Sequence, residues 1–337
     1  MLYEEPFRHA RNSKKMLKRC LNIKDNRYLK QEFVSENISP YIDNKNGKKR
    51  LIECPSDDLK KIQKSIKSEL AKLNFPRYVF SGVKKRSFVD NAKLHKGNKY
   101  LYKMDITAFF PSIGREKVFN FYKDKLCMPP DIAEILTNFT TIDLDDTKIK
   151  NKGEVDAFLK EKGVKTRNHL ISGSPASQLL SYLANQDMFD SVHTLSNKNG
   201  IMMTLYVDDI IFSSPNRISA NFIEIVENII SSQGYRLSKR KAKSHTKYYP
   251  KRVTGVIINK QGDISISNSI RKKTIDKCRQ LKANPDDEQS RRELRGLVET
   301  ARQVIPNAYP SIHKLAYDPN YKLSHMKQKP TPSIIKK

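Results

Sequence analysis

The paired aspartates Asp208 and Asp209 constrain the fold more than any other feature, because they lie within the apolar run IMMTLYVDDIIFSS (201–214). The residues on both sides are largely apolar, which predicts two short strands joined by a sharp turn. Two like charges at a hairpin tip repel each other unless a cation neutralises them. An Asp-Asp turn also occurs between strands for conformational reasons alone. The pair therefore favours a metal site but leaves a plain turn open.

A third aspartate ends another apolar segment. The run YLYKMDITAFFPSI (100–113) predicts a strand that leads into Asp105, then a bend, then a helix opened by Pro111. Carboxylates and substrate phosphates are the ligands with which proteins hold Mg²⁺. Two acidic strand ends in one chain indicate a site for two Mg²⁺ ions, about 4 Å apart, that grip a triphosphate. Asp105, Asp208 and Asp209 are the predicted catalytic residues.

The charge balance points to the partner. The chain holds 64 lysines and arginines against 36 aspartates and glutamates, so its formal net charge is +28. Such a surplus repels itself unless a polyanion lies nearby, and basic side chains bind nucleic acid by displacing counterions from phosphates. Nucleic acid is therefore the expected partner. A protein that is basic for another reason, such as a ribosome-associated one, is the alternative.

Length and cysteine pattern narrow the class further. The 337 residues, 37% of them hydrophobic, can form one large domain or a tightly joined pair. No run approaches the ~18 apolar residues of a membrane span, and the N-terminus has no apolar signal core. The four cysteines form no CxxC pair, which argues against a zinc site and fits reduced thiols. We expect a soluble cytoplasmic protein with no membrane partner.

The remaining pattern predicts an α+β fold. Residues 41–55 read as two strands around a turn at Asn46-Gly47, and residues 253–267 read as a hairpin with a Gln261-Gly262 turn. Apolar spacing predicts helices in four places, which are 56–73, the segment after Gly173-Ser174-Pro175, 218–229, and from 270 onward. The polar residues 141–168 read as an insertion or mobile loop with a short helix near 154–162. This order favours an antiparallel sheet backed by helices.

Several of these segments resemble the motifs of reverse transcriptases. Tyr206-Val207-Asp208-Asp209 is similar to the Tyr-x-Asp-Asp box of that family, and Asp105 with Phe109-Phe110 is similar to its first palm motif. Gly173-Ser174-Pro175 resembles the Gly-x-Pro turn before the palm helix, and residues 45–50 resemble the fingers hairpin. The resemblance runs from about residue 41 to about residue 320.

Two further segments narrow the resemblance to the bacterial retron branch. Asn91-Ala92-Lys93-Leu94-His95 is similar to its NAxxH motif, and Val253-Thr254-Gly255 to its VTG triplet. The resemblance implies a right-hand polymerase fold, with an N-terminal region and fingers (1–98), an antiparallel-sheet palm that contains the polar insertion (99–260), and a helical thumb with a C-terminal tail (261–337).

The function implied by this resemblance is RNA-directed DNA synthesis. Retron enzymes use dNTPs to copy a structured noncoding RNA into single-stranded DNA, which branches from a guanosine 2′-hydroxyl of that RNA. They act in antiphage defence with an effector protein encoded nearby. A group II intron-type or diversity-generating reverse transcriptase is one alternative for this chain. A basic RNA-binding scaffold without catalysis is the other.

The resemblance also assigns roles residue by residue. Lys241 aligns with a lysine that protonates the leaving pyrophosphate, and Ile106 joins the three aspartates at the metals. The substrate-binding positions are Lys45, Arg50, Phe110, Ser172, Gly173 and Tyr206, and the nucleic-acid-binding positions are Asn91, His95, Arg252, Val253, Thr254 and Gly255.

Structural alternatives remain for several of these positions. Lys45 and Arg50 can belong to a solvated charged turn, and His95 can satisfy a hydrogen bond in the core. The aromatic ring five positions after Asp105 is expected to act as the steric gate under the sugar, with Phe109 buried, although both rings can be core. The chain departs from the family at Ser172, where most relatives carry Gln, and at Gln178, where Pro is frequent.

Overall fold

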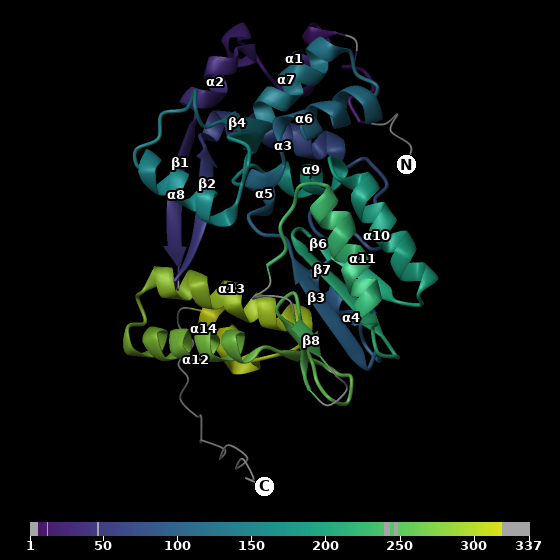
Figure 1. Cartoon of the computed structure of the whole chain (residues 1–337). Coiled ribbons are helices and arrows are strands. Elements are labelled where there is room, and N and C mark those ends of the chain that lie inside the picture. The colour runs from purple at the N-terminus through teal and green to yellow at the C-terminus, as the bar shows by residue number, and fades with distance from the viewer. Residues whose placement is uncertain (1–5, 12, 46, 239–242, 246–248, 319–337) are drawn as a thin grey trace. The chain divides into compact units, whose positions relative to one another are not determined.

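A computed structural model describes residues 6–11, 13–45, 47–238, 243–245 and 249–318 of the chain. The chain divides into two units, Met1–Tyr249 and Pro250–Lys337 (Figure 1). The first unit mixes helices with an antiparallel sheet, and the second consists of short strands followed by helices. This composition confirms the predicted α+β class.

The first unit is built around a four-stranded antiparallel sheet. Its strands lie in the order β6 (Met202–Tyr206), β7 (Asp209–Ser214), β3 (Tyr100–Asp105) and β8 (Lys243–His245). β7 pairs with β3 along its whole length, so that Asp209 lies opposite Asp105. Met203, Leu205 and the apolar side chains of β7 are buried, as the apolar, β-branched run predicts, whereas Met202 at the start of β6 is exposed. The strands expected before Asp105 and on both sides of the paired aspartates are confirmed.

The first unit also contains helices outside the segment 141–168. They are α1 (Lys14–Cys20), α2 (Gln31–Glu36), α3 (Asp57–Leu70), α4 (Phe88–Leu94), α5 (Phe109–Ser112), α6 (Arg115–Asn120), α7 (Pro130–Thr140), α9 (Ser177–Leu183), α10 (Gln186–Lys198) and α11 (Ala220–Ser232), with the 3₁₀ turn η1 (Asn26–Leu29) and the π-helical turn η2 (Phe121–Lys125). The predicted helices correspond to α3, α9 and α11. The helix predicted to open at Pro111 begins earlier, because Ala108 adopts φ +46° and reverses the chain there.

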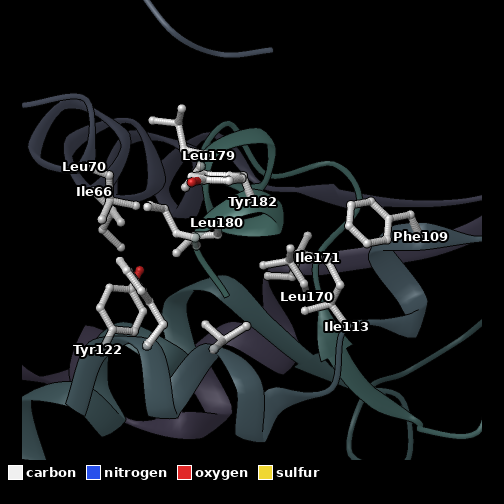
Figure 2. Close-up of a cluster of buried hydrophobic side chains, with 14 of the residues drawn as sticks. Ile66, Leu70, Phe109, Ile113, Tyr122, Leu170, Ile171, Leu179, Leu180 and Tyr182 are labelled. Atoms are coloured by element: carbon white, nitrogen blue, oxygen red, sulfur yellow. The ribbon is translucent and has the colours of Figure 1, made fainter. Parts of the chain in front are cut away.

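Side chains from separate helices meet in one hydrophobic cluster (Figure 2). Leu179 and Tyr182 of α9 lie beside Ile66 and Leu70 of α3, with Tyr122 of η2 on the same side. All five are almost completely buried. Burying a large apolar side chain contributes roughly 1.5–3 kcal/mol. This cluster therefore fixes α9, and with it the Gly173-Ser174-Pro175 turn that precedes the helix.

The predicted hairpin over 41–55 is present. β1 (Ile38–Lys45) pairs with β2 (Lys48–Pro55) through eight residue pairs, and Gly47 turns the chain with φ +70°. Asn46, the other predicted turn residue, lies outside the described residues. In β2, Leu51, Glu53 and Pro55 alternate as buried residues, so one face of the hairpin packs on the first unit.

The polar segment 141–168 is ordered rather than a mobile loop. β4 (Thr141–Asp143) pairs with β5 (Asn168–Leu170), and α8 (Lys152–Lys162) forms where a short helix was predicted. α8 buries three apolar side chains, and Arg167 forms ion pairs with Asp145 and Asp156. α8 lies along the β1–β2 hairpin (Figure 1). Its three apolar side chains stand among many polar residues, so the sequence pattern did not reveal that they are buried.

The second unit has its own core. β9 (Lys251–Val253), β10 (Val256–Ile258) and β11 (Ile264–Ile266) form a three-stranded sheet, which adds one strand to the predicted hairpin. Three helices follow, α12 (Asn268–Ala283), α13 (Glu288–Val304) and α14 (Pro310–Tyr317). The buried Arg291 of α13 donates to the carbonyl of Leu315, which ties α14 to α13. In the part of the chain that the structure describes, each helix is too short or too polar to cross a bilayer.

Candidate active site

Asp105, Asp208 and Asp209, here called the carboxylate cluster, come together at one end of the central sheet. Each contributes one carboxylate oxygen, and these three oxygens lie within 4.8 Å of one another. Asp105 is the last residue of β3 and is only 4% exposed, while the other two are half-buried. Three negative groups this close repel one another strongly unless positive charge is near. The prediction that these three aspartates lie close together is confirmed.

The backbone between β6 and β7 explains how Asp208 reaches this position. Tyr206 pairs with Asp209, so only Val207 and Asp208 form the turn. Val207 adopts φ +58°, which is a genuine outlier for a β-branched residue. The N–H of Ile106 donates to the carbonyl of Asp208 (3.1 Å), which ties the turn to the end of β3. Outliers of this kind cost on the order of 1–3 kcal/mol and gather at functional sites.

Lys103 lies beside the carboxylate cluster and was not predicted from the sequence. Its Nζ lies 2.6 Å from Asp209 Oδ2, and the two side chains are 23% and 21% exposed. Lys103 stands two residues before Asp105 on β3, so both side chains project from the same face of the strand. That spacing was the available signal. The ammonium group offsets part of the repulsion within the carboxylate cluster.

The donor set of the carboxylate cluster fits Mg²⁺. Magnesium prefers hard oxygen ligands and is held in proteins through one or two carboxylates together with substrate phosphates. Ile106, the fourth predicted metal-binding position, has a buried side chain, and its N–H is engaged by Asp208. Its side chain therefore packs in the core and offers no ligand atom.

The two phenylalanines after Asp105 lie in different surroundings. Phe109 is 4% exposed and packs edge-on against Phe189 and Tyr235. Phe110 is half-buried at the margin of the same core. The left-handed Ala108 before them reverses the chain close to the carboxylate cluster. The ring of Phe109 is therefore packed in the core, whereas the ring of Phe110 retains accessible surface.

Ser172 and Gly173 are occupied by contacts with β2. The hydroxyl of Ser172 accepts from the Glu53 N–H (3.1 Å) and donates to the carbonyl of Leu51 (3.1 Å). The N–H of Ser172 donates to Glu53 Oε2 (2.7 Å). A β-carbon at Gly173 would lie 2.2 Å from the carbonyl oxygen of Glu53, so only glycine fits. The hydroxyl of Ser172 is thus bonded to β2 while the residue stays partly accessible, and its contact with the nucleotide stays a prediction.

A buried pair supports that junction. Glu53 of β2 and His169 of β5 are both fully buried, and Glu53 Oε1 lies 2.6 Å from His169 Nε2. The same carboxylate therefore holds β5 through His169 and the α9 turn through Ser172. Charged groups at this depth are tolerated only when they are paired and hydrogen-bonded. Glu53 thus joins β2 to β5 and to the turn that follows β5, more than 110 residues later in the chain.

The other predicted substrate positions are less enclosed. Arg50 is exposed on β2 opposite Asp43, and Tyr206 is half-buried, where burial raises the pKa of its phenol. The backbone of Lys45 ends β1, but its side chain lies outside the described residues, as does all of Lys241.

The predicted RNA contacts of Asn91 and His95 are wrong for this structure, because both side chains are fully buried. His95 Nδ1 lies 2.7 Å from Ser213 Oγ, and His95 Nε2 lies 2.7 Å from Thr204 Oγ1. Burial lowers the pKa of His95 to about 3, so the ring is neutral at neutral pH. The NAxxH segment thus fastens α4 to β6 and β7, and the core interpretation of His95 is the correct one.

The VTG triplet lies at the turn between β9 and β10. Val253 is fully buried, so its predicted RNA contact is also wrong. Thr254 and Gly255 form the turn with φ +44° and φ +91°, and both are partly accessible. Arg252 is exposed on β9. Accessibility therefore limits any RNA contact in this segment to Arg252, Thr254 and Gly255.

Known proteins are similar to this chain over most of its length. The sequence profile of the family "Reverse transcriptase (RNA-dependent DNA polymerase)" matches residues 42–258. The retron Se72 reverse transcriptase of Salmonella heidelberg is 28% identical over 208 residues, which are 59% of this chain and 47% of that protein. The retron Ec83 reverse transcriptase of Escherichia coli is 23% identical over 265 residues, 76% of this chain and 79% of that protein.

A third relative is the retron Mx162 reverse transcriptase of Myxococcus xanthus, which is 24% identical over 237 residues. The match covers 67% of this chain and 47% of that protein, so the chain spans about half the length of two of these three relatives. These relatives confirm the resemblance to retron enzymes that the motifs indicated. The family profile covers more than half of the chain, includes all three aspartates of the carboxylate cluster, and so shows that this chain belongs to the reverse transcriptase family.

Proposed function

We propose that this chain is an RNA-directed DNA polymerase that copies a structured noncoding RNA into single-stranded DNA. The carboxylate cluster, in a member of the reverse transcriptase family, is the observation that carries the proposal. The net charge of +28 supports a nucleic-acid substrate. A basic scaffold would gain nothing from three converging carboxylates, because they would repel the phosphates of its RNA.

In the proposed reaction, a primer hydroxyl attacks the α-phosphate of a dNTP and pyrophosphate leaves. Asp105, Asp208 and Asp209 would hold two Mg²⁺ ions, which when bound would supply Lewis-acid chemistry that lowers the pKa of the attacking hydroxyl and stabilises charge on the phosphates. The protein fixes the ligands through the Val207 turn and holds Asp209 by the ammonium group of Lys103. We assign to Arg50 the contact with the triphosphate, since a guanidinium fork matches phosphate oxygens. Lys241 is assigned the protonation of pyrophosphate.

The division into fingers (1–98), palm (99–260) and thumb (261–337) is part of this proposal. The β1–β2 hairpin, the central sheet and the separate helical core of α12–α14 support it. The structure divides the chain after Tyr249, which would place β9 to β11 with the thumb helices. In this arrangement Arg252, Thr254 and Gly255 contact the RNA from the second unit.

The retron role forms the finer part of the proposal. The relatives named above are retron reverse transcriptases, and the chain carries the NAxxH and VTG segments. We assign to it the synthesis of a DNA that branches from an RNA 2′-hydroxyl, in antiphage defence with an effector protein encoded nearby. Sequencing the nucleic acid that co-purifies with the chain checks this assignment, because a covalent RNA–DNA branch would be present in it.

Catalysis is tested by Asp208→Asn, which removes one ligand charge and leaves the basic surface unchanged. Its control is Asp146→Asn, an exposed aspartate outside the carboxylate cluster. Magnesium-dependent primer extension and RNA affinity are measured side by side. We expect Asp208→Asn to abolish extension and to keep RNA affinity, while the control retains both. Extension by Asp208→Asn at the wild-type rate would refute the assigned site.

Sugar selection is assigned to Phe110, the accessible ring of the pair. An aromatic ring beneath the nucleotide excludes a ribose 2′-hydroxyl by steric clash, and exclusion of this kind can discriminate strongly. Phe110→Val should admit ribonucleotides while dNTP incorporation persists. The matched variant Phe109→Val should instead lower the free energy of unfolding, by on the order of 1–4 kcal/mol. Ribonucleotide incorporation by Phe109→Val alone would reverse the two roles.

A further inference from the structure

The N-terminal segment of the first unit borders an open cavity of about 530 Å³, which the carboxylate cluster does not explain. Four basic residues line it, which are Lys14, Lys15, Lys18 and Arg19 of α1. α1 is fastened to the main core by the buried Leu17. The cavity is therefore a fixed part of the first unit. In Figure 1, α1 lies at the edge of this unit, away from the strands β3, β6 and β7.

The charges around this cavity lack a matching set of carboxylates. Lys14 Nζ lies 3.3 Å from Asp131, but within the described ranges no carboxylate lies at ion-pair distance from Lys15, Lys18 or Arg19. Lys18 donates instead to the neutral side chain of Asn26 (2.6 Å). Residues three and four apart share one face of a helix, where like charges destabilise it. An anion at this face would remove that repulsion.

The wall of the cavity indicates what kind of anion it takes. Ile23 is 7% exposed and Leu29 is half-buried, and both contribute apolar surface beside the basic residues. An inorganic anion uses only the charges, whereas a nucleotide unit carries a phosphate together with a sugar and base that can rest on apolar side chains. Several cations along one helix face also suit a ligand with several phosphates.

We propose that α1 and η1 form a binding site for the phosphodiester backbone of RNA, apart from the site of synthesis. The inference rests on the proposed function, because RNA is taken as the substrate that the chain must hold. Lys15, Lys18 and Arg19, here called the α1 triad, contact successive phosphates, and Ile23 and Leu29 face the sugar or base. The site retains a structured template while its copied end passes the carboxylate cluster.

The test replaces the α1 triad by Gln in the full chain. The matched control replaces Lys64, Lys150 and Lys198, three exposed lysines on other segments with no acidic partner among the described residues, so both variants lose the same charge. The probe is a labelled hairpin RNA with single-stranded ends, titrated at several salt concentrations. Each lost phosphate contact lowers the slope of log affinity against log salt by roughly 0.7–0.9.

We expect the variant in the α1 triad to bind this RNA more weakly and to lose about 2 to 3 from its salt slope, with a change below about 1 in the control. Equal affinities and slopes for the two variants would overturn the proposal. So would retention of RNA binding by the triad variant together with loss of binding to anionic phospholipid vesicles, which would assign the cavity to a membrane surface.

Two further measurements keep the result interpretable. The single variant Lys15→Glu, at an exposed position, repeats the test if the triple variant does not fold. It should weaken RNA binding more than Lys64→Glu does, and equal effects of the two would again overturn the site. Extension of a short primed template at saturating concentration should match the wild type in all variants. If the wild type itself fails to extend, the proposed function fails, whatever the α1 triad does.

Discussion

The β6–β7 hairpin carries two polar clusters in opposite surroundings. At its tip, Asp208 and Asp209 are half-buried and charged, with Lys103 beside them. Further along the same two strands, Thr204 and Ser213 are fully buried and meet the two ring nitrogens of His95. The tip holds carboxylates that a ligand can reach, whereas the inner cluster holds buried groups whose hydrogen bonds stay within the protein. Accessibility to a ligand, more than polarity, distinguishes the residues assigned to catalysis from those that stabilise the fold.

This contrast changes the meaning of the NAxxH segment. A buried hydroxyl or imidazole costs free energy unless it is hydrogen-bonded. His95 satisfies one hydroxyl on each strand, and Asn98 also donates to Ser213 Oγ (2.7 Å). The segment therefore braces the two strands that present the aspartates. Its influence on synthesis would be indirect, through the position of the hairpin.

The largest effect that distinguishes the two clusters is expected from His95→Ala. The change removes two hydrogen bonds and leaves a cavity, so the free energy of unfolding should fall by about 2–5 kcal/mol. Asp208→Asn should leave it unchanged or raise it, because one repelling charge is removed. Denaturant titration of both variants makes the measurement. If His95→Ala proves as stable as the wild type and selectively loses RNA binding, His95 contacts RNA, as first predicted from the motif.

The second expected effect concerns pH. His95 has a pKa of about 3 in the folded chain, against an ordinary value of 6.5. The neutral ring stabilises the fold fully above pH 6.5, and this contribution is lost as the pH falls from 6.5 toward 3, by about 1.4 kcal/mol per pH unit. Stability of the wild type and of His95→Gln is compared across this range. Their difference should shrink as the pH falls, and a constant difference would mean that His95 is not sealed in the core.

The smallest expected effect tests the tip. Lys103→Met removes a cation from the carboxylate cluster, so the negative field there becomes stronger. The Mg²⁺ concentration that half-saturates primer extension should fall several-fold. Lys99→Met, an exposed position just before β3, serves as the control and should leave this concentration unchanged. A higher Mg²⁺ requirement in Lys103→Met would show that Lys103 mainly orients Asp209.

The comparison also shows what the sequence could predict. The strands around Asp105 and the paired aspartates follow from local apolar patterning, and their pairing places the charges together. Lys103 was visible as well, because two-residue spacing on a strand puts it on the face of Asp105, but no motif drew attention to it. The local sequence pattern was thus enough to predict features that depend only on residues close together in the sequence.

Burial by distant segments could not be predicted in this way. Asn91 and Val253 belong to motifs, and nothing in their own segments shows that other elements cover them. Ser172 depends on Glu53, which lies on another strand. The insertion at 141–168 conceals an apolar face of only three residues in a polar stretch. In each case the decisive contacts arise from tertiary structure.

The left-handed backbone of Val207 has a consequence for repeated work. A template-copying enzyme places its ligands anew for every nucleotide that it adds, and a loosely held tip would search its conformations in each cycle. Here a two-residue turn and the hydrogen bond from Ile106 leave the tip one arrangement. The ordering entropy is lost once, when the chain folds, and not again at each addition. The strained turn at Val207 would in this way present the aspartates in the same position at every nucleotide addition along a long product.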